Sequence, residues 1–269
     1  MVPAAVSDLL VRSSEEPAPD GCLVRVTPES AGWRHVGFEV YRLGRGARLQ
    51  RATDGQEVCA VLLSGRADVT FAGREWAEIG RRESVFEGVP PYAVHAPPGG
   101  TLSLQAVTDV LEVALCWAPA SAGVAPVLIT PEDCRVSTRG EGITERRIHD
   151  VLMESRAAES LLITEVLTPG GHWSSYPPHK HDTDDPPRER YLEETYYHRT
   201  RRAAGFAVQL VYTEDGSLDA ALRVRDGDVV LVPRGYHPVS AAPGCDLYYL
   251  NVMAGPVREW RVTVDPDST

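Results

Sequence analysis

The chain has 269 residues, a formal net charge of −11 at pH 7, 23 glycines and 21 prolines. The acidic balance argues against an extended basic surface for nucleic acid, and no apolar run approaches the roughly 20 residues of a membrane span. The N-terminus lacks the basic and apolar regions of a signal peptide and the five cysteines are widely separated, so we expect a soluble, cytoplasmic protein with free thiols and no membrane contact.

Short apolar runs separated by glycine, proline and aspartate recur along the first half of the chain. Runs of this kind, without helical periodicity between them, are typical of a β-sandwich or barrel. The strands expected in this half are Val36–Leu43, Glu57–Leu63, Ala67–Phe71, Ser84–Phe86, Ala93–Ala96, Leu102–Val107 and Leu111–Trp117.

A second series of runs follows residues 126–147, which have the composition of a connector. Its expected strands are Ser160–Leu167, Thr195–Arg199, Ala207–Tyr212, Asp228–Val232 and Leu247–Val252. Both series pass through a strand, a glycine-rich turn and an apolar strand before proline-rich sequence, which indicates an internal duplication. We therefore predict two β domains, residues 1–130 and residues 131–269.

A histidine-rich segment in the second half carries the strongest chemical signal. His179 and His181 are two residues apart, so on a strand their side chains lie on the same face. A carboxylate follows from Glu193 or Glu194, and His237 comes after an apolar strand and a Pro/Gly turn. Three histidines and one carboxylate bind a divalent metal and leave a position for water or substrate.

These residues resemble the two signature motifs of cupins: the H179-K-H181 pair with its downstream glutamate, and G227-x5-P233-x-G235-x-H237. Longer phrases, WRHVGFEVYRL (33–43), TPGGHWSSYPPHKHD (168–182), LEETYYHR (192–199), VLVPRGYHPV (230–239) and LYYLNVMAGPVREW (247–260), resemble the 5-deoxy-glucuronate isomerases of inositol catabolism, the IolB family. The resemblance extends from residue 33 to residue 267.

The resemblance implies an all-β bicupin fold of two tandem jelly-roll-like barrels. It places the metal in the C-terminal cupin, with an N-terminal cupin that lacks metal ligands. It also favours Glu194 over Glu193, because the E-x-Y-Y pattern matches the metal glutamate of related uronate isomerases. The implied ligands are His179, His181, Glu194 and His237. The implied cofactor is one divalent ion, with zinc favoured and manganese, iron or nickel as alternatives.

The family activity is the aldose–ketose isomerisation of 5-deoxy-D-glucuronate to 5-dehydro-2-deoxy-D-gluconate. Such a site needs a proton shuttle and a cation for the substrate carboxylate. Candidate catalytic residues are Tyr196, His198 and Tyr236. Candidate substrate-binding residues are Arg199, Arg234, Tyr176, Gln209 and Asn251, although surface salt bridges account equally well for the two arginines. Lys180 alternates with the two ligand histidines, so it is expected to point away from the metal.

Two other functions are compatible with the same residues. A metal-dependent cupin dioxygenase uses a similar ligand set, and a non-catalytic sugar-acid-binding cupin needs only the barrel. We expect a small sugar acid as the ligand and, because cupins often pair through strand edges, a homodimer.

Overall fold

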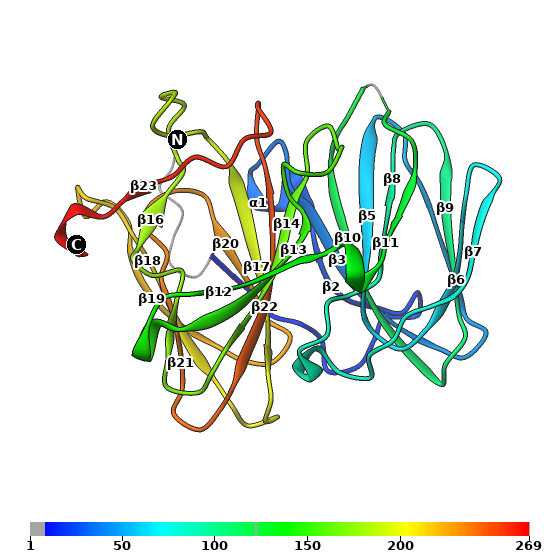
Figure 1. Ribbon diagram of the computed structural model, residues 1–269, viewed down its shortest axis with the longest axis horizontal. Coiled ribbons are helices and arrows are strands. Elements are labelled where there is room, and N and C mark those ends of the chain that lie inside the picture. Colours follow the sequence, from blue (N-terminus) through cyan, green and yellow to red (C-terminus); the bar gives the residue numbers. More distant parts are fainter. Residues whose placement is uncertain (1–8, 122, 269) are drawn as a thin grey trace. The chain divides into compact units, whose positions relative to one another are not determined.

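The computed structural model describes residues 9–121 and 123–268, which fold into two compact units, each built almost wholly of strands (Figure 1). The C-terminal unit comprises residues 9–13, 136–149 and 162–268, and the N-terminal unit comprises residues 14–121, 123–135 and 150–161. Within the described residues, no helix has the length and apolar character that a membrane span requires.

The N-terminal unit consists of two antiparallel sheets. The larger sheet contains, in spatial order, β11 (Val127–Ile129), β8 (Ala93–Ala96), β5 (Gln56–Ser64), β10 (Val110–Pro119), β3 (Gly37–Gly44) and β2 (Cys22–Val26). The smaller sheet contains β4 (Arg48–Ala52), β9 (Thr101–Ala106), β6 (Ala67–Phe71) and β7 (Arg74–Ile79). Inward side chains of both sheets form one apolar core that includes Tyr41, Leu62, Phe71 and Leu104.

The C-terminal unit also contains two main sheets. The larger sheet has the order β1 (Leu10–Val11), β20 (Val229–Val232), β17 (Glu193–Thr200), β22 (Leu247–Ala254), β14 (Leu162–Thr168), β13 (Arg146–Leu152) and β12 (Arg135–Arg139). The smaller sheet has the order β15 (Trp173–Ser174), β21 (Val239–Ala241), β18 (Ala207–Tyr212) and β19 (Asp219–Val224), and β16 (His179–Lys180) pairs with β23 (Thr263–Val264). Within this unit, β18, β19 and β21 lie on one side and β17, β22 and β14 on the other (Figure 1).

Strand alternation explains how the C-terminal unit forms its interior. Buried and exposed residues alternate strictly along β19, which is typical of a strand with one solvated face. Strand β22 lies between β17 and β14 and is buried along its whole length. The resulting core includes Tyr196, Tyr249 and Val230, and full burial of a large apolar side chain stabilises the fold by about 1.5–3 kcal/mol.

The named helical elements of the described residues are single turns: α1 (Pro28–Ala31), η2 (Val85–Glu87), η3 (Pro131–Asp133), η4 (Gly142–Thr144) and η5 (Pro266–Ser268).

Most of the predicted strands are confirmed, and Ala67–Phe71, Ala93–Ala96 and Ala207–Tyr212 have the expected bounds. The strand predicted at Ser84–Phe86 is wrong, because this segment forms the 3-10 turn η2. The Ser84 hydroxyl accepts from Phe86 N–H, and the Glu87 carboxylate accepts from Ser84 N–H, so local hydrogen bonds stabilise a turn. The predicted connector at residues 126–147 is also more ordered than expected, because it contains β11, β12 and the start of β13.

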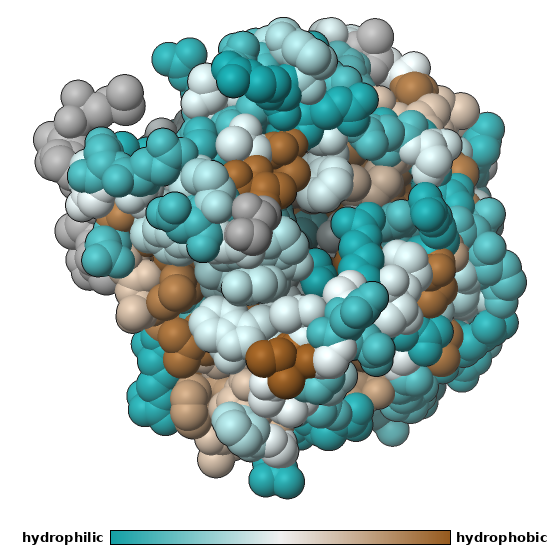
Figure 2. Space-filling model, turned by 60° about the vertical axis from the view of Figure 1, so that its left-hand side comes forward, coloured by the Kyte–Doolittle hydropathy of each residue, from teal (hydrophilic) through white to brown (hydrophobic). Residues whose placement is uncertain are grey.

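Figure 2 shows one face of the surface that is largely hydrophilic, with hydrophobic residues in scattered patches. Scattered apolar residues of this kind are ordinary on protein surfaces.

Candidate metal centre

Strand β17 supplies the carboxylate of the centre. Glu194, Tyr196 and His198 are two residues apart along this strand, so their side chains share the face that lines the interior. All three are buried. Glu193 precedes Glu194 on the strand and therefore lies on the opposite face, which places Glu194 rather than Glu193 beside the histidines.

The first two histidines come from the short strand β16 and the residue after it. His179 pairs with Val264 of β23, and His181 follows directly. Lys180 between them points elsewhere, as predicted, because its ammonium group contacts Asp182 at 2.9 Å and Glu189 at 3.2 Å.

The third histidine is positioned by the turn after β20. Gly235 has a φ of +85°, and an added Cβ would lie 2.3 Å from the Tyr212 carbonyl oxygen, so only glycine fits this turn. The Gly235 N–H donates to Asp182 Oδ2 at 2.8 Å, and Tyr236 exchanges two backbone hydrogen bonds with Tyr212. This fixed turn directs the buried His237 ring into the interior.

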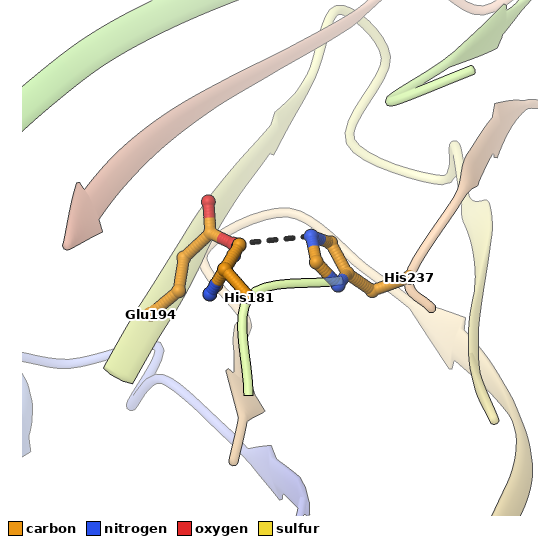
Figure 3. A group of neighbouring side chains, drawn as sticks. All are labelled: His181, Glu194 and His237. Atoms are coloured by element: carbon orange, nitrogen blue, oxygen red, sulfur yellow. Dashed lines mark hydrogen bonds and ion pairs between the residues drawn. The ribbon is translucent and has the colours of Figure 1, made fainter. Parts of the chain in front are cut away.

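Figure 3 shows His181, Glu194 and His237 directed toward one another from three separate segments. One potential ligand atom from each lies within 4.8 Å of the others. The Nε2 atoms of His181 and His237 lie 3.0 and 3.2 Å from the same carboxylate oxygen, Glu194 Oε2. His179 stands at the edge of this group, with its ring centroid 4.9 Å from that of His237 and 6.4 Å from that of His181.

Backbone carbonyls hold the Nδ1 atoms of the three histidines, and the Nε2 atom of His181 contacts the Glu194 carboxylate. His181 Nδ1 donates to the Leu192 carbonyl at 2.9 Å, and His237 Nδ1 donates to the Gly235 carbonyl at 2.8 Å. His179 Nδ1 contacts the Pro177 carbonyl at 3.3 Å. A carbonyl oxygen only accepts, so each Nδ1 carries a hydrogen, and in the neutral form of each ring Nε2 is the atom that can bind a metal.

Lone pairs aimed at a carboxylate repel it unless a positive charge lies between them. His237 Nε2 makes no hydrogen bond despite its short distance to Glu194. The arrangement of three Nε2 lone pairs, one carboxylate and backbone carbonyls holding the opposite ring nitrogens is that of a histidine–carboxylate metal site. The residues therefore fit a divalent ion.

The electrostatics of the group agree with this fit. Burial opposes ionisation of Glu194, but its contacts with His181 and His237 hold the pKa of the carboxyl well below its ordinary value. Burial also disfavours a charged His181, but the Glu194 carboxylate outweighs this and raises the His181 pKa. Burial, followed by the neighbouring histidines, lowers the pKa of His179 to about 3, so His179 remains a neutral ligand.

Asn251 and Tyr196 surround the carboxylate. Asn251 on β22 is the register partner of Tyr196, and its amide donates to Glu194 Oε1, the oxygen that the histidines leave free. The Tyr196 hydroxyl lies 2.9 Å from the Ser175 hydroxyl, and the Tyr196 ring is 5.7 Å from that of His237. Asn251 thus orients the proposed ligand carboxylate, while Tyr196 lies beside the metal histidines.

His198 and Gln209 form a pair one step deeper in the interior. His198 Nε2 and Gln209 Oε1 are 2.8 Å apart, and the His198 ring stacks on Tyr196 at 5.9 Å. Burial lowers the pKa of His198 to about 4, so the ring is neutral at neutral pH. Both residues contact the site through Tyr196.

The other predicted residues have partners outside the histidine group. The Tyr236 hydroxyl donates to Glu214 at 2.6 Å, and Arg199 forms an ion pair with Asp226 at 2.9 Å. Arg234 lines a surface pocket of about 250 Å³ together with Lys180, Asp182, Thr213, Glu214 and Asp215. The Tyr176 ring packs 6.2 Å from that of Trp173.

The sequence analysis did not single out two residues that interact with this group. Trp260 packs its ring edge-on against His179 at 6.0 Å, and the half-buried Arg146 of β13 interacts electrostatically with Tyr249 and Tyr196. Trp260 ends a phrase that carried the family resemblance, but nothing local linked it to a histidine. Arg146 lies in the segment that was taken for a connector.

Comparison with known proteins adds independent information. A family model described as the KduI/IolB family matches residues 9–269. A 5-deoxy-glucuronate isomerase of Geobacillus kaustophilus is 54% identical over 258 residues, which cover 96% of this chain and 93% of the relative. The crystal structure of an IolB-like protein from Salmonella typhimurium has a TM-score of 0.94 at 44% identity, covering 97% of this chain and 98% of the other.

A more distant similarity concerns the fold alone. A Lactobacillus farciminis oxalate decarboxylase, solved as a formate complex, has a TM-score of 0.68 at 16% identity and covers 97% of this chain and 89% of its own. Together with the IolB-like structure it confirms the predicted all-β, bicupin fold.

Proposed function

Because the chain belongs to the KduI/IolB family, we propose that it is a 5-deoxy-glucuronate isomerase that acts with a divalent metal. The substrate and product are 5-deoxy-D-glucuronate and 5-dehydro-2-deoxy-D-gluconate of inositol catabolism. The observation that supports metal assistance is the convergence of histidine Nε2 atoms on the buried Glu194 carboxylate.

The proposed ligands are His179, His181, Glu194 and His237, with zinc favoured over manganese, iron or nickel. Imidazole nitrogens with one carboxylate suit zinc and other first-row metals. When bound, the ion supplies a Lewis acid for the aldehyde oxygen and the neighbouring hydroxyl oxygen of the sugar acid. The hydrogen on the carbinol carbon next to the aldehyde moves to the aldehyde carbon. The carbinol hydroxyl loses its proton and becomes the ketone, while the aldehyde oxygen gains a proton and becomes a hydroxyl.

Among the predicted catalytic residues, Tyr196 has the position that suits contact with the substrate. Burial, followed by the Glu194 charge, raises the Tyr196 pKa well above its ordinary value, so the phenol keeps its proton. Tyr196 therefore acts as a hydrogen-bond donor to a substrate oxygen, with Ser175 holding its hydroxyl in place. The neutral His198 supports the ring from behind, where Gln209 fixes its tautomer.

The proposal also covers the division of the chain into halves, the oligomeric state and the location of the protein. Metal binding is assigned to residues 131–269, while residues 1–130 form a partner half without a metal. In support, the buried His95 of the N-terminal unit contacts Glu57 at 3.0 Å, and the one converging group of three ligand residues in the described chain is in the other unit. The protein is proposed to be a cytoplasmic homodimer that binds neither nucleic acid nor membrane.

Proton NMR of the purified, zinc-loaded protein with 5-deoxy-D-glucuronate in heavy water tests the activity. We expect the signals of the aldehyde hydrate and anomeric forms to decline while new methylene signals of the ketone product grow. Absence of turnover with metal present would refute the isomerase and would direct the next assay to oxygen consumption, which a dioxygenase requires.

Variants of the ligands test the metal centre separately. His237→Ala and His179→Ala are expected to abolish zinc retention, measured by elemental analysis after dialysis, and turnover together. His35→Ala, in the N-terminal unit, is the matched control and should retain both. Full activity in a metal-free His237→Ala protein would contradict the proposed centre.

A further inference from the structure

Arg146 is the first residue of strand β13, and its positively charged side chain lies on the face of the strand that packs against the core of the C-terminal unit. Arg146 and Ile148 are two residues apart on this strand, so they share one face. Ile148 packs in the core cluster that contains Tyr196 and Tyr249. The Arg146 side chain is therefore directed toward the interior that holds the metal residues.

This guanidinium has no anionic partner within the described part of the chain. Arg146 Nη1 donates to the Thr144 carbonyl at 3.0 Å, and no described carboxylate lies within ion-pair distance. The side chain is half-buried. A partly desolvated arginine without a carboxylate is costly to the protein alone, and it has unused donors arranged in a fork that matches a carboxylate.

The charge around Arg146 also favours an anion. Burial lowers the Arg146 pKa, and the positive charge of Arg139 lowers it further, while the phenols of Tyr249 and Tyr196 oppose this. Arg139 extends over the Trp260 ring with its Cζ 5.7 Å from the centroid. A carboxylate bound beside both arginines would reduce the electrostatic repulsion between them.

A short row of rings connects Arg146 with the metal residues. The Tyr249 ring lies 5.1 Å from that of Tyr196, which lies 5.7 Å from that of His237. The hydroxyls along this row are held by serines, Tyr249 by Ser174 and Tyr196 by Ser175. Four hydroxyl groups therefore lie along this row, and its two tyrosines are the ones that interact electrostatically with Arg146.

We propose that Arg146, with Arg139 beside it, binds the carboxylate of the sugar acid while the aldehyde end faces the histidine group. The inference rests on the proposed function and names the residues that select an acid over a neutral sugar. We prefer Arg146 to the arginines predicted from sequence, because Arg199 is paired with Asp226 and Arg234 lines a surface pocket with the acidic residues Asp182, Glu214 and Asp215.

Two unreactive probes test the assignment without turnover. One is the alditol acid formed when the aldehyde of 5-deoxy-D-glucuronate is reduced to a hydroxymethyl group. The other is the neutral alditol in which the carboxylate is also a hydroxymethyl group. Their affinities for the zinc-loaded protein are measured by isothermal titration calorimetry for the wild type, Arg146→Met, Arg146→Lys and the control Arg147→Met, whose exposed residue lies on the opposite face of β13.

The wild type and Arg147→Met are expected to bind the acid about 10–100-fold more tightly than the neutral alditol, the range of hydrogen bonds to a charged group. Arg146→Met should reduce this preference to less than about 3-fold, and Arg146→Lys should retain part of it. Equal loss of affinity for both probes in Arg146→Met, or no preference for the acid in the wild type, would overturn the inference. A preference that depends on Arg146 in a protein without isomerase activity would refute the proposed function and leave the carboxylate site standing.

Discussion

The buried carboxylate of Glu57 offers a quantitative test of what stabilises the N-terminal unit. Glu57 lies on β5 and accepts hydrogen bonds from the backbone N–H groups of Glu159, Ser160 and Leu161 at 2.9, 2.7 and 2.6 Å. His95 Nε2 lies 3.0 Å from its second oxygen. The carboxylate thus fixes residues 159–161, which return to this unit after the chain has left it at residue 135.

The magnitude follows from the pKa of this carboxyl. Burial disfavours its charge, but the His95 contact and the three N–H groups outweigh burial and lower the Glu57 pKa from 4.5 to about 2. Each pKa unit corresponds to about 1.4 kcal/mol, so ionised Glu57 stabilises the folded unit by about 3 kcal/mol. Because the folded pKa is the lower one, this contribution is complete above pH 4.5 and is lost as the pH falls toward 2.

The test compares Glu57→Gln with Glu75→Gln, an exposed residue on β7 of the same unit. Glutamine cannot accept at both positions, so at pH 7 we expect Glu57→Gln to lower the free energy of unfolding by about 3 kcal/mol. Urea unfolding between pH 7 and pH 3 should show the two proteins converging as the pH falls, and hydrogen exchange should show faster exchange at residues 159–161. A destabilisation of the same size at pH 3 and pH 7 would refute the electrostatic explanation.

Three further predictions concern the C-terminal unit. Removal of metal by a chelator should lower the Tm of this unit by about 5–10 °C, and added zinc should restore it. The reason is that zinc at 100 times its Kd stabilises the folded state by about 2.7 kcal/mol. An unchanged scanning-calorimetry trace would argue against a bound ion. Tyr196→Phe should reduce kcat about 100-fold with metal retained and KM little changed, and unaltered steady-state kinetics would make Tyr196 structural. The pKa of His198 is about 4 in the folded protein, and its ordinary value is 6.5, so between these pH values the unfolded chain binds a proton that the folded protein does not. The free energy of unfolding should therefore fall by about 3 kcal/mol as the pH is lowered from 6.5 to 4. His198→Gln should flatten this decline in urea unfolding, and an unchanged slope would exclude His198 as its source.

Local pattern was sufficient for most of the fold because strand burial repeats every two residues. Burial alternates along Ala207–Tyr212, and the sequence identifies this strand by its β-branched and aromatic residues Val208, Val211 and Tyr212. The same rule failed at Ser84–Phe86, where the apolar pair Val85 and Phe86 belongs to a turn stabilised by Ser84 and Glu87. It also failed at Arg135–Arg139, a strand of alternating polar residues at the sheet edge, because no apolar face marks it.

The residues of the candidate site also differ in whether local sequence is enough to identify them. The H-x-H spacing is local, so the sequence shows that His179 and His181 share a face, and the structure adds the carbonyl contacts that set their tautomers. The environment of Arg146 is not local: Tyr196 and Tyr249 follow it by many residues and reach it only through the order of strands in the sheet. A sequence pattern can therefore identify ligands that belong to a short motif. An arginine becomes a candidate for substrate binding only when the structure shows that no carboxylate of the described chain pairs with it. Arg199 shows the converse, since its closeness to the motif along the chain made it a candidate and its ion pair with Asp226 satisfies it without a substrate.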